Sequence, residues 1–252
     1  MKSLSKVVAL VLAITIIGSC LVTGCGSKKD KYIIGTDTVF APFEMKDASG
    51  NYFGIDIEIL DAVARDQGFA YELQALGFDA CLTAVQAGEI DGMIAGMSIR
   101  PDREEIYDFS TPYFDSGVCC AVMDPGITKL EDLKGKTVAA KASTEGLTYA
   151  NSIKDQYGFK SVVVYDDSAY MYEAVKVGDA DACFEDYPVM GYGISQGNGF
   201  HMITDLVKGS SYGFAVKKGK NAKLLEMFNK GFANIKANGT YQAILDKYIK
   251  AV

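Results

Sequence analysis

The stretches AVQAGEIDGMI at residues 84–94 and AVKVGDADACF at residues 174–184 align without gaps at a constant offset of 90 residues. Each stretch indicates the end of a helix, a glycine turn, an acidic loop and a buried strand. Any helix–glycine–strand unit would show part of this pattern. The segments 31–36 and 136–141 also resemble each other, and both indicate a first strand. Together the two similarities predict two related lobes.

Outside these stretches, short β-rich runs alternate with amphipathic helical segments, which is typical of α/β proteins with parallel strands. Asp79 is a plausible N-cap of a helix that ends at Gly88. Strands are expected at residues 32–35, 93–95, 118–123, 137–140, 162–164, 182–184 and 214–216. Helices are expected at residues 57–64, 146–157 and 168–177, and an apolar helical stripe at Leu224, Leu225, Phe228, Phe232 and Ile235.

The two repeats place Ala95-Gly96 and Glu185-Asp186 at equivalent carboxyl ends of strands. Ligands of open α/β sheets bind at those ends. The sequence therefore predicts a ligand site in a cleft between the two lobes.

Composition excludes several function classes. The 252 residues carry 25 Lys plus Arg against 32 Asp plus Glu, a net charge of −7, which argues against nucleic acid as a partner. The single histidine, His201, argues against metal sites built from several imidazoles. We expect no metal and no cofactor.

The first 25 residues indicate an export signal. Lys2 and Lys6 precede an apolar run at residues 7–17, which is short for a bilayer span, and small residues lead to Val22-Thr23-Gly24-Cys25. This ending resembles a bacterial lipobox, in which Cys25 would receive the lipid and become the mature N-terminus. The polar residues 26–30 would then be a tether.

Two alternatives remain for this segment. Ile17-Gly18-Ser19-Cys20 is a second, weaker lipobox candidate, and the apolar run could instead be a transmembrane anchor. With the lipid on Cys25, the mature chain would lie outside the cytoplasm, anchored to the outer face of the cytoplasmic membrane.

Four cysteines remain beyond the signal segment: Cys81, Cys119, Cys120 and Cys183. They show no metal-ligand spacing, and adjacent cysteines cannot easily pair with each other. We interpret them as buried small apolar residues, with a bridge such as Cys119–Cys183 as the alternative.

Five motifs from residue 31 onward resemble the bacterial extracellular solute-binding proteins, family 3, the amino acid receptors of ABC importers. They are GTDTVFAPF at 35–43, GIDIEIL at 54–60 followed by AVA at 62–64, AGMS at 95–98 with Asp102 and Arg103, DFSTPY at 108–113, and NGTY at 238–241. The resemblance implies a two-lobe, Venus-flytrap (type II periplasmic-binding-protein-like) α/β fold. Lobe 1 would comprise residues 31–113 and 213–252, lobe 2 residues 118–207, and two hinge strands residues 113–118 and 207–213.

The resemblance also implies how the backbone ends of an amino acid would be held. Arg103 would bind the ligand α-carboxylate in a bidentate fork, which guanidinium provides and ammonium does not. Ser98 and the Gly96 backbone would add hydrogen bonds, and Thr144 would open a helix whose N-terminus favours an anion. Asp186 would pair with the ligand α-ammonium, although by position it could also cap the helix near Pro188.

Further positions would contact the ligand side chain. Phe40 and Phe78 match the aromatic residues that sandwich its aliphatic stem. Asp37 and Lys141 match an acceptor and a donor that bind a side-chain amide in the glutamine-binding branch. The chain departs from that branch at Glu145 and Glu185, and two additional carboxylates would favour a cationic ligand.

These observations predict a monomeric, lipid-anchored receptor, not an enzyme, that binds a polar amino acid and delivers it to a membrane permease. Glutamine is the first expectation, because a carboxamide satisfies both Asp37 and Lys141. Cationic amino acids, glutamate and cystine are the alternatives. The same fold could also serve a sensor for a membrane partner, or a cyclohexadienyl-dehydratase-like enzyme with Glu145 or Glu185 as general acid.

Overall fold

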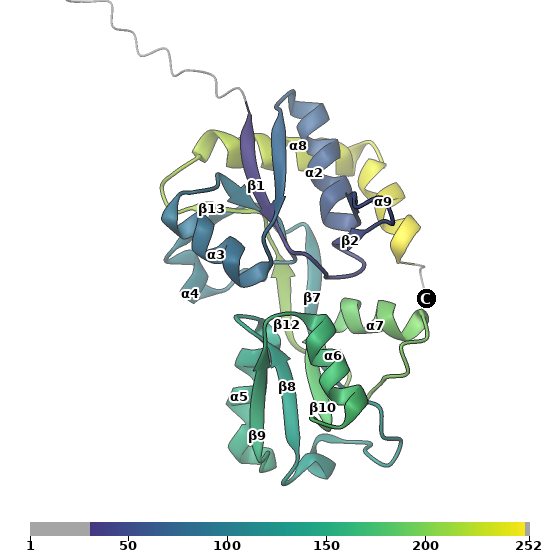
Figure 1. Cartoon of the computed structure of the whole chain (residues 1–252). Helices are drawn as coiled ribbons and strands as arrows, with labels where there is room; N and C mark the ends of the chain where they lie inside the picture. Colours follow the sequence, from purple (N-terminus) through teal and green to yellow (C-terminus); the bar gives the residue numbers. More distant parts are fainter. Residues whose placement is uncertain (1–30, 250–252) are drawn as a thin grey trace, which may run out of the picture. The chain divides into compact units, whose positions relative to one another are not determined.

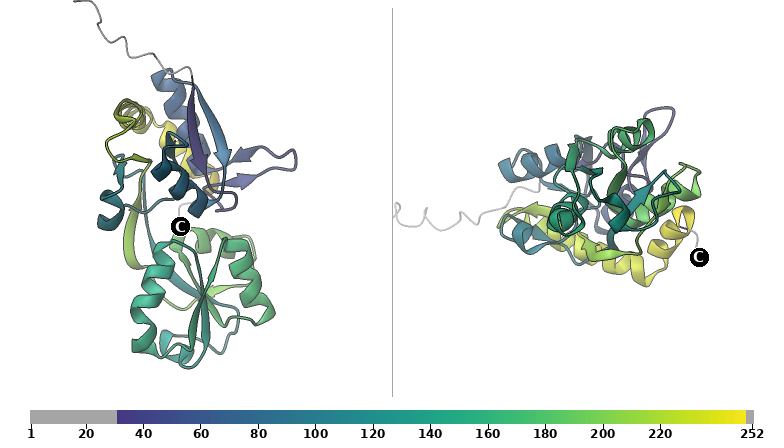
Figure 2. Two further views of the ribbon diagram at one scale, coloured as in Figure 1. Left: turned by 60° about the vertical axis from the view of Figure 1, so that its left-hand side comes forward. Right: turned by 90° about the horizontal axis from the view of Figure 1, so that it is seen from below.

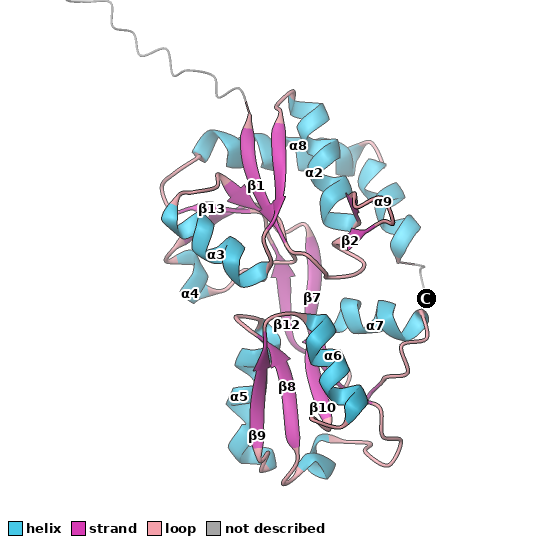
Figure 3. Cartoon of the chain, in the orientation of Figure 1, coloured by secondary structure: helices cyan, strands magenta, loops and turns pink. Residues whose placement is uncertain are grey.

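The computed structural model describes residues 31–249, which are organised around two β-sheets that are each covered by helices (Figures 1 and 3). The signal segment, Cys25 and the tether lie outside the described residues. Within the described range, every helix is too short or too polar to cross a membrane.

The first sheet has the strand order β4-β1-β5-β13-β6. Its strands are β1 (Tyr32–Thr36), β4 (Tyr71–Ala75), β5 (Gly92–Met93), β6 (Tyr107–Phe109) and β13 (Ala215–Lys217). Strand β1 is parallel to β4 and β5, whereas β13 runs antiparallel to β5 and β6. The C-terminal strand β13 thus completes the sheet that the N-terminal residues begin.

Apolar side chains cover both faces of this sheet. One face packs against helices α2 (Ile55–Gln67) and α8 (Ala222–Ala237), and the other against α3 (Phe78–Ala87). Helix α9 (Thr240–Tyr248) packs against α2 and α8. The expected stripe on α8 is buried at four of its five positions, and Phe228 stacks on Phe214 with ring centroids 4.5 Å apart.

The second sheet has the strand order β11-β7-β10-β8-β9, and β12 pairs with β7. Its strands are β7 (Phe114–Val122), β8 (Thr137–Lys141), β9 (Ser161–Tyr165), β10 (Ala182–Asp186), β11 (His201–Met202) and β12 (Val207–Tyr212). Helix α5 (Glu145–Tyr157) covers one face, and α6 (Ser168–Val177) and α7 (Tyr187–Ser195) cover the other (Figure 2). The remaining elements are β2 (Met45–Lys46), β3 (Tyr52–Phe53), α4 (Pro101–Glu104) and a 3₁₀ turn at Leu130–Leu133.

The repeat predicted from the sequence is present in the structure. Helices α2 and α5 have 13 residues each, α3 and α6 have 10 each, and both pairs begin 90 residues apart. The glycine turns at Gly88 and Gly178 have φ of 81° and 84°, a left-handed conformation that glycine adopts without strain. Lobe 1 differs by an insertion between its first strand and first helix, which holds the β2–β3 hairpin.

Two local expectations need correction. Helix α3 begins at Phe78 with Gly77 at its N-cap, so Asp79 lies in the first turn, where its carboxylate accepts a hydrogen bond from Ser143 Oγ at 2.5 Å. The strand expected at 118–123 begins at Phe114 and pairs with β12. The interpretation of Cys81, Cys119, Cys120 and Cys183 as buried apolar residues is confirmed: all four are free and buried, and the alternative bridge between Cys119 and Cys183 does not form.

Candidate functional site

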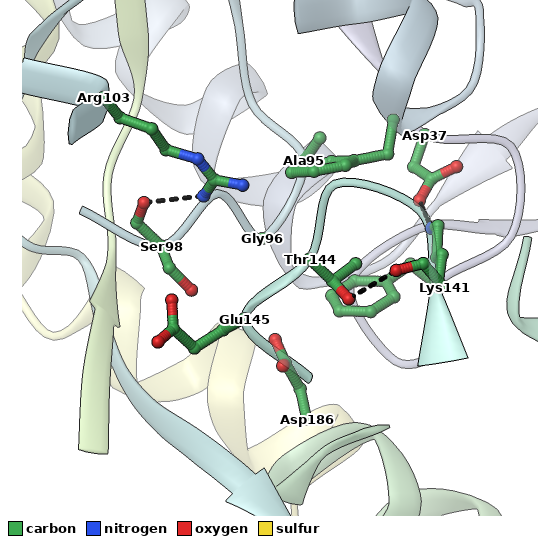
Figure 4. Close-up of a pocket in the computed structure, with 11 residues that line it drawn as sticks. Asp37, Ala95, Gly96, Ser98, Arg103, Lys141, Thr144, Glu145 and Asp186 are labelled. Carbon is green, nitrogen blue, oxygen red and sulfur yellow. Dashed lines mark hydrogen bonds and ion pairs between the residues drawn. The ribbon is translucent and has the colours of Figure 1, made fainter. Parts of the chain in front are cut away.

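Residues of both lobes line one pocket (Figure 4). The structure brings all eleven predicted ligand-binding positions together in its lining. These are Asp37, Phe40, Phe78, Ala95, Gly96, Ser98, Arg103, Lys141, Thr144, Glu145 and Asp186. Their contact with a ligand stays a prediction.

A buried ion pair marks one end of the pocket. Asp37 directly follows β1, Lys141 ends β8, and the Lys141 ammonium donates a hydrogen bond to the Asp37 carboxylate. Their side chains are only 1% and 2% exposed. Burying two charges is costly unless they compensate each other or a further polar partner joins them.

Two aromatic rings line the pocket beside its cations. Lys141 Nζ lies 5.1 Å from the centre of the Phe40 ring and 5.5 Å from that of Phe78. The guanidinium of Arg103 lies 5.3 Å from the centre of the Phe78 ring. Phe78, the first residue of α3, therefore contacts both buried cations, a favourable cation–π arrangement.

Arg103 connects the two lobes. Its Nη1 donates to the Ser98 carbonyl at 2.8 Å, and its Nη2 donates to the Ser143 carbonyl at 2.7 Å. Burial lowers the pKa of Arg103 to about 10, so the guanidinium stays charged at neutral pH. These two contacts use two of its five N–H donors.

The N-terminus of α5 faces the same space. Thr144 is its N-cap: the Thr144 hydroxyl accepts from the Leu147 amide at 3.3 Å and donates to the Lys141 carbonyl at 2.7 Å. At Gly146 an added Cβ would lie 2.7 Å from the Phe184 carbonyl oxygen, so only glycine lets this turn approach the end of β10. Unpaired N–H groups and the helix dipole favour an anion here.

Asp186 ends β10 and occupies the N-cap position of α7, but its side chain makes no capping hydrogen bond. Its carboxylate accepts instead from the Tyr212 hydroxyl, which comes from β12. Burial, together with the nearby Glu185 charge, raises the pKa of Asp186 to about 7. The sequence analysis did not identify Tyr212, because a tyrosine in a strand carries no signal that distinguishes it from core.

The two departures from the glutamine-binding pattern behave differently. Glu185 does not line the pocket. Its carboxylate accepts hydrogen bonds from Ser168 Oγ at 2.7 Å and from Tyr172 Oη at 2.8 Å. Glu145 lines the pocket, but it also pairs with Arg100 Nη1 at 3.4 Å and lies 3.9 Å from Lys208 Nζ. Only Glu145 therefore adds a carboxylate to the site.

A buried pair of carboxyl groups supports the pocket from behind. Asp56 accepts from the Gly96 amide at 2.8 Å and from Tyr113 Oη at 2.7 Å. Glu44 lies beside it, and burial together with the Asp56 charge raises the pKa of Glu44 well above its ordinary value. Sequence reasoning treated Asp56 only as part of a motif and did not assign Glu44, since their proximity depends on the fold.

Comparison with known proteins places the chain in one family. The model of the bacterial extracellular solute-binding proteins, family 3, matches residues 32–251. The arginine-binding extracellular protein ArtP of Bacillus subtilis (strain 168) is 28% identical over 92% of this chain and 95% of its own length. Further relatives are named as arginine-, cystine- and glutamine-binding proteins.

Two solved structures differ in how well they superpose. Substrate-binding domain 2 of Lactococcus lactis GlnP in an open conformation is 41% identical, covers 89% of this chain and 97% of that chain, and has a TM-score of 0.64. An ancestral arginine-binding protein bound to glutamine is 32% identical, covers 88% and 99%, and has a TM-score of 0.81. The less similar sequence gives the better superposition.

Proposed function

The chain belongs to the bacterial extracellular solute-binding proteins, family 3, and is an amino acid-binding component of an ABC transporter, and we propose that it binds glutamine between its lobes. The ligand would be enclosed as the lobes close about β7 and β12, the strands at which the chain passes between the two sheets. The closed complex would then be presented to the permease. Hinge closure around a ligand is a common motion in such proteins.

In this proposal, the ligand zwitterion bridges the lobes. Arg103 and the N-terminus of α5 take the α-carboxylate, and Asp186 takes the α-ammonium. Asp186 is nearly fully buried, and its carboxylate accepts a hydrogen bond from the neutral Tyr212 hydroxyl. A buried carboxylate without a close cation is costly, which supports an ammonium group as its partner.

The Asp37–Lys141 pair is the observation that carries the choice of glutamine. Asp37 accepts hydrogen bonds and Lys141 donates them. A terminal carboxamide offers NH₂ to the first and C=O to the second. Glutamate would set its carboxylate against Asp37, and lysine or arginine would set a cation against Lys141.

Cationic ligands are the second candidate, because Glu145 lines the pocket and several relatives are named as arginine-binding proteins. Two contacts weigh against it. Glu145 is paired with Arg100, and Glu185 faces Ser168 and Tyr172 instead of the pocket. Neither carboxylate is therefore free to neutralise a second cation beside Lys141.

The same contacts argue against a dehydratase-like enzyme. A general acid must reach the substrate with a proton to give. Glu185 is not part of the pocket lining, and the Glu145 carboxylate already contacts Arg100 and Lys208.

Calorimetric titration of the parent and of Lys141→Met with glutamine and arginine tests the ligand. We expect glutamine to bind the parent at least about tenfold more tightly, a difference of roughly 1.4 kcal/mol, and Lys141→Met to lose most of that preference. Lys217→Met, a change outside the pocket, is the control. Tighter binding of arginine by the parent would contradict glutamine as the ligand and leave the receptor class intact.

The anchor is a separate part of the proposal. Cys25 would carry the lipid that holds the receptor, acting as a monomer, at the outer face of the cytoplasmic membrane. Cys25→Ala should release the protein into the soluble fraction, as measured by membrane fractionation. Full retention of this variant in membranes would contradict the lipobox assignment.

A further inference from the structure

Glu145 stands at the end of the pocket that the proposed function gives to the ligand carboxylate. It is the first residue of α5, next to the N-cap Thr144, and its side chain is 2% exposed. An unpaired carboxylate at this place would repel the ligand carboxylate across a short, poorly screened distance. The favourable field from Arg103 and the helix N-terminus would then be partly cancelled.

Two cations from different parts of the chain converge on Glu145. Arg100 Nη1 lies 3.4 Å from Glu145 Oε2, and Lys208 Nζ lies 3.9 Å from Glu145 Oε1, so each carboxylate oxygen faces one cation. Arg100 belongs to the loop before α4, and Lys208 lies in β12.

Neighbouring side chains hold Arg100 toward Glu145, whereas the Lys208 side chain is 56% exposed. Arg100 forms a fork with Asp102, with Nε–Oδ1 at 3.1 Å and Nη2–Oδ2 at 2.8 Å, and its Nη1 also donates to Thr148 Oγ1 at 3.2 Å. Lys208 has φ of 49° at an irregularity in the β12–β7 pairing, which directs it away from the regular strand path.

Glu145 separates the ligand pocket from this basic cluster. It lines the pocket with Arg103 and Asp186, and it also lines a second pocket together with Arg100, Thr148 and Lys208. The two cations therefore stand behind Glu145 and do not line the ligand pocket itself.

From this arrangement we infer that Arg100, assisted by Lys208, is a positioning residue for amino acid binding. It neutralises Glu145 and draws its carboxylate away from the ligand carboxylate, so that Arg103 can bind that carboxylate. The inference rests on the proposed function, but only on the carboxylate end of the ligand. It holds for any amino acid that the pocket accepts.

The test is a rescue experiment by calorimetric titration with glutamine and, in parallel, arginine. Arg100→Met should weaken binding of the preferred amino acid about tenfold or more, because it leaves a buried carboxylate facing the ligand carboxylate. Glu145→Gln in the Arg100→Met background should restore binding to within about threefold of the parent, since no charge is left to neutralise. Arg65→Met is the matched control, because Arg65 is 80% exposed and lies in α2, where it pairs with Asp61.

The α-amide of the preferred amino acid separates this role from a mechanical one. The α-amide lacks the negative charge, and we expect it to bind more weakly than the amino acid. Its affinity should differ by less than about threefold between the parent and Arg100→Met.

A simple latch between the lobes predicts a different pattern. It predicts that Glu145→Gln fails to rescue and that the α-amide loses affinity as the amino acid does. Either result would overturn the inference, as would an Arg100→Met variant that binds like the parent or a parent that binds no amino acid. A parent that prefers arginine, with rescue intact, would overturn the glutamine assignment and support the role of Arg100.

Discussion

The two lobes have the same construction, but at equivalent strand ends they present side chains of opposite charge to the pocket. Asp91 and Asp181 mark the equivalence: each carboxylate accepts from a backbone amide of its lobe's first strand, at Ile33 (2.8 Å) and Thr137 (3.0 Å). At the ends of these first strands, lobe 1 carries Asp37 and lobe 2 carries Lys141.

The same inversion occurs at the second pair of strand ends. In lobe 1, Ala95-Gly96 follow strand β5, and Arg103 supplies a cation nearby. In lobe 2, the acidic residues Glu185-Asp186 end strand β10. In the proposed binding mode, a zwitterion with a dipolar side chain would therefore find half of its partners in each lobe. The comparison shows how a repeated scaffold can require both halves for binding.

The lobes also stabilise their loops in different ways. The residue of lobe 1 that corresponds to Gly146 at the helix start is Asp56, whose buried carboxylate holds the Gly96 amide. In lobe 2, Gly146 instead lets α5 approach the Phe184 carbonyl directly. In lobe 1 the Asp56 side chain connects the helix start to the loop after β5, and in lobe 2 the missing side chain of Gly146 lets the helix start contact the end of β10 directly.

The largest expected effect comes from removing one charge in either lobe. Arg103→Ala and Asp186→Ala should each weaken amino acid binding by about thirty- to several-thousand-fold, which corresponds to roughly 2–5 kcal/mol for one member of a buried charge pair. Calorimetric titration measures the loss, with Arg65→Ala as a control. A folded variant that binds within threefold of the parent would show that its lobe does not contribute as we propose.

The pH dependence of binding tests lobe 2 alone. The pKa of Asp186 is raised to about 7 by burial and by Glu185, and an ammonium ligand needs the ionised form. Affinity should therefore fall about fivefold from pH 7 to pH 6 and about tenfold per unit below that. Titrations from pH 5 to pH 8 measure this fall.

Glu185→Gln serves as the comparison for the pH series. It removes the neighbouring negative charge while it keeps an acceptor for Ser168 and Tyr172. The fall in affinity should then move to lower pH. An affinity that stays constant from pH 8 to pH 5 in the parent would contradict the role of Asp186.

A smaller effect is expected in lobe 1, at the carboxyl pair formed by Glu44 and Asp56. Burial and Asp56 raise the pKa of Glu44 above its ordinary value of 4.5, so the folded state keeps a proton that the unfolded state releases. Stability should therefore decrease as pH rises from 4.5 toward the folded pKa. Glu44→Gln has no such proton, so we expect it to unfold within about 1 kcal/mol of the parent at pH 5 and to be the more stable protein at pH 9.

Urea unfolding at both pH values measures this difference. Glu173→Gln, an exposed position in lobe 2, should show no pH-dependent gain. A Glu44→Gln variant that tracks the parent at both pH values would mean that the carboxyl pair holds no extra proton.

Local sequence signals were sufficient for the repeated α/β units, the family and the positions at the strand ends. Apolar periodicity, glycine turns and motif order can each be read over a few residues, and the carboxyl ends of parallel strands meet at one edge whatever the detailed packing. The strand-end rule supported placing Asp186 at the cleft, whereas Asp37 and Arg103 were assigned to the same pocket by the resemblance to the family.

Which side chains meet depended on the tertiary structure. Asp79 contacts Ser143 instead of capping its own helix, Tyr212 reaches Asp186 from β12, and Arg100 meets Glu145 across the lobes. Such contacts join residues from separate elements, and their partners depend on packing angles and on a few ångströms of side-chain reach. No local pattern encodes those quantities, because each side chain would satisfy its polar groups equally well in water.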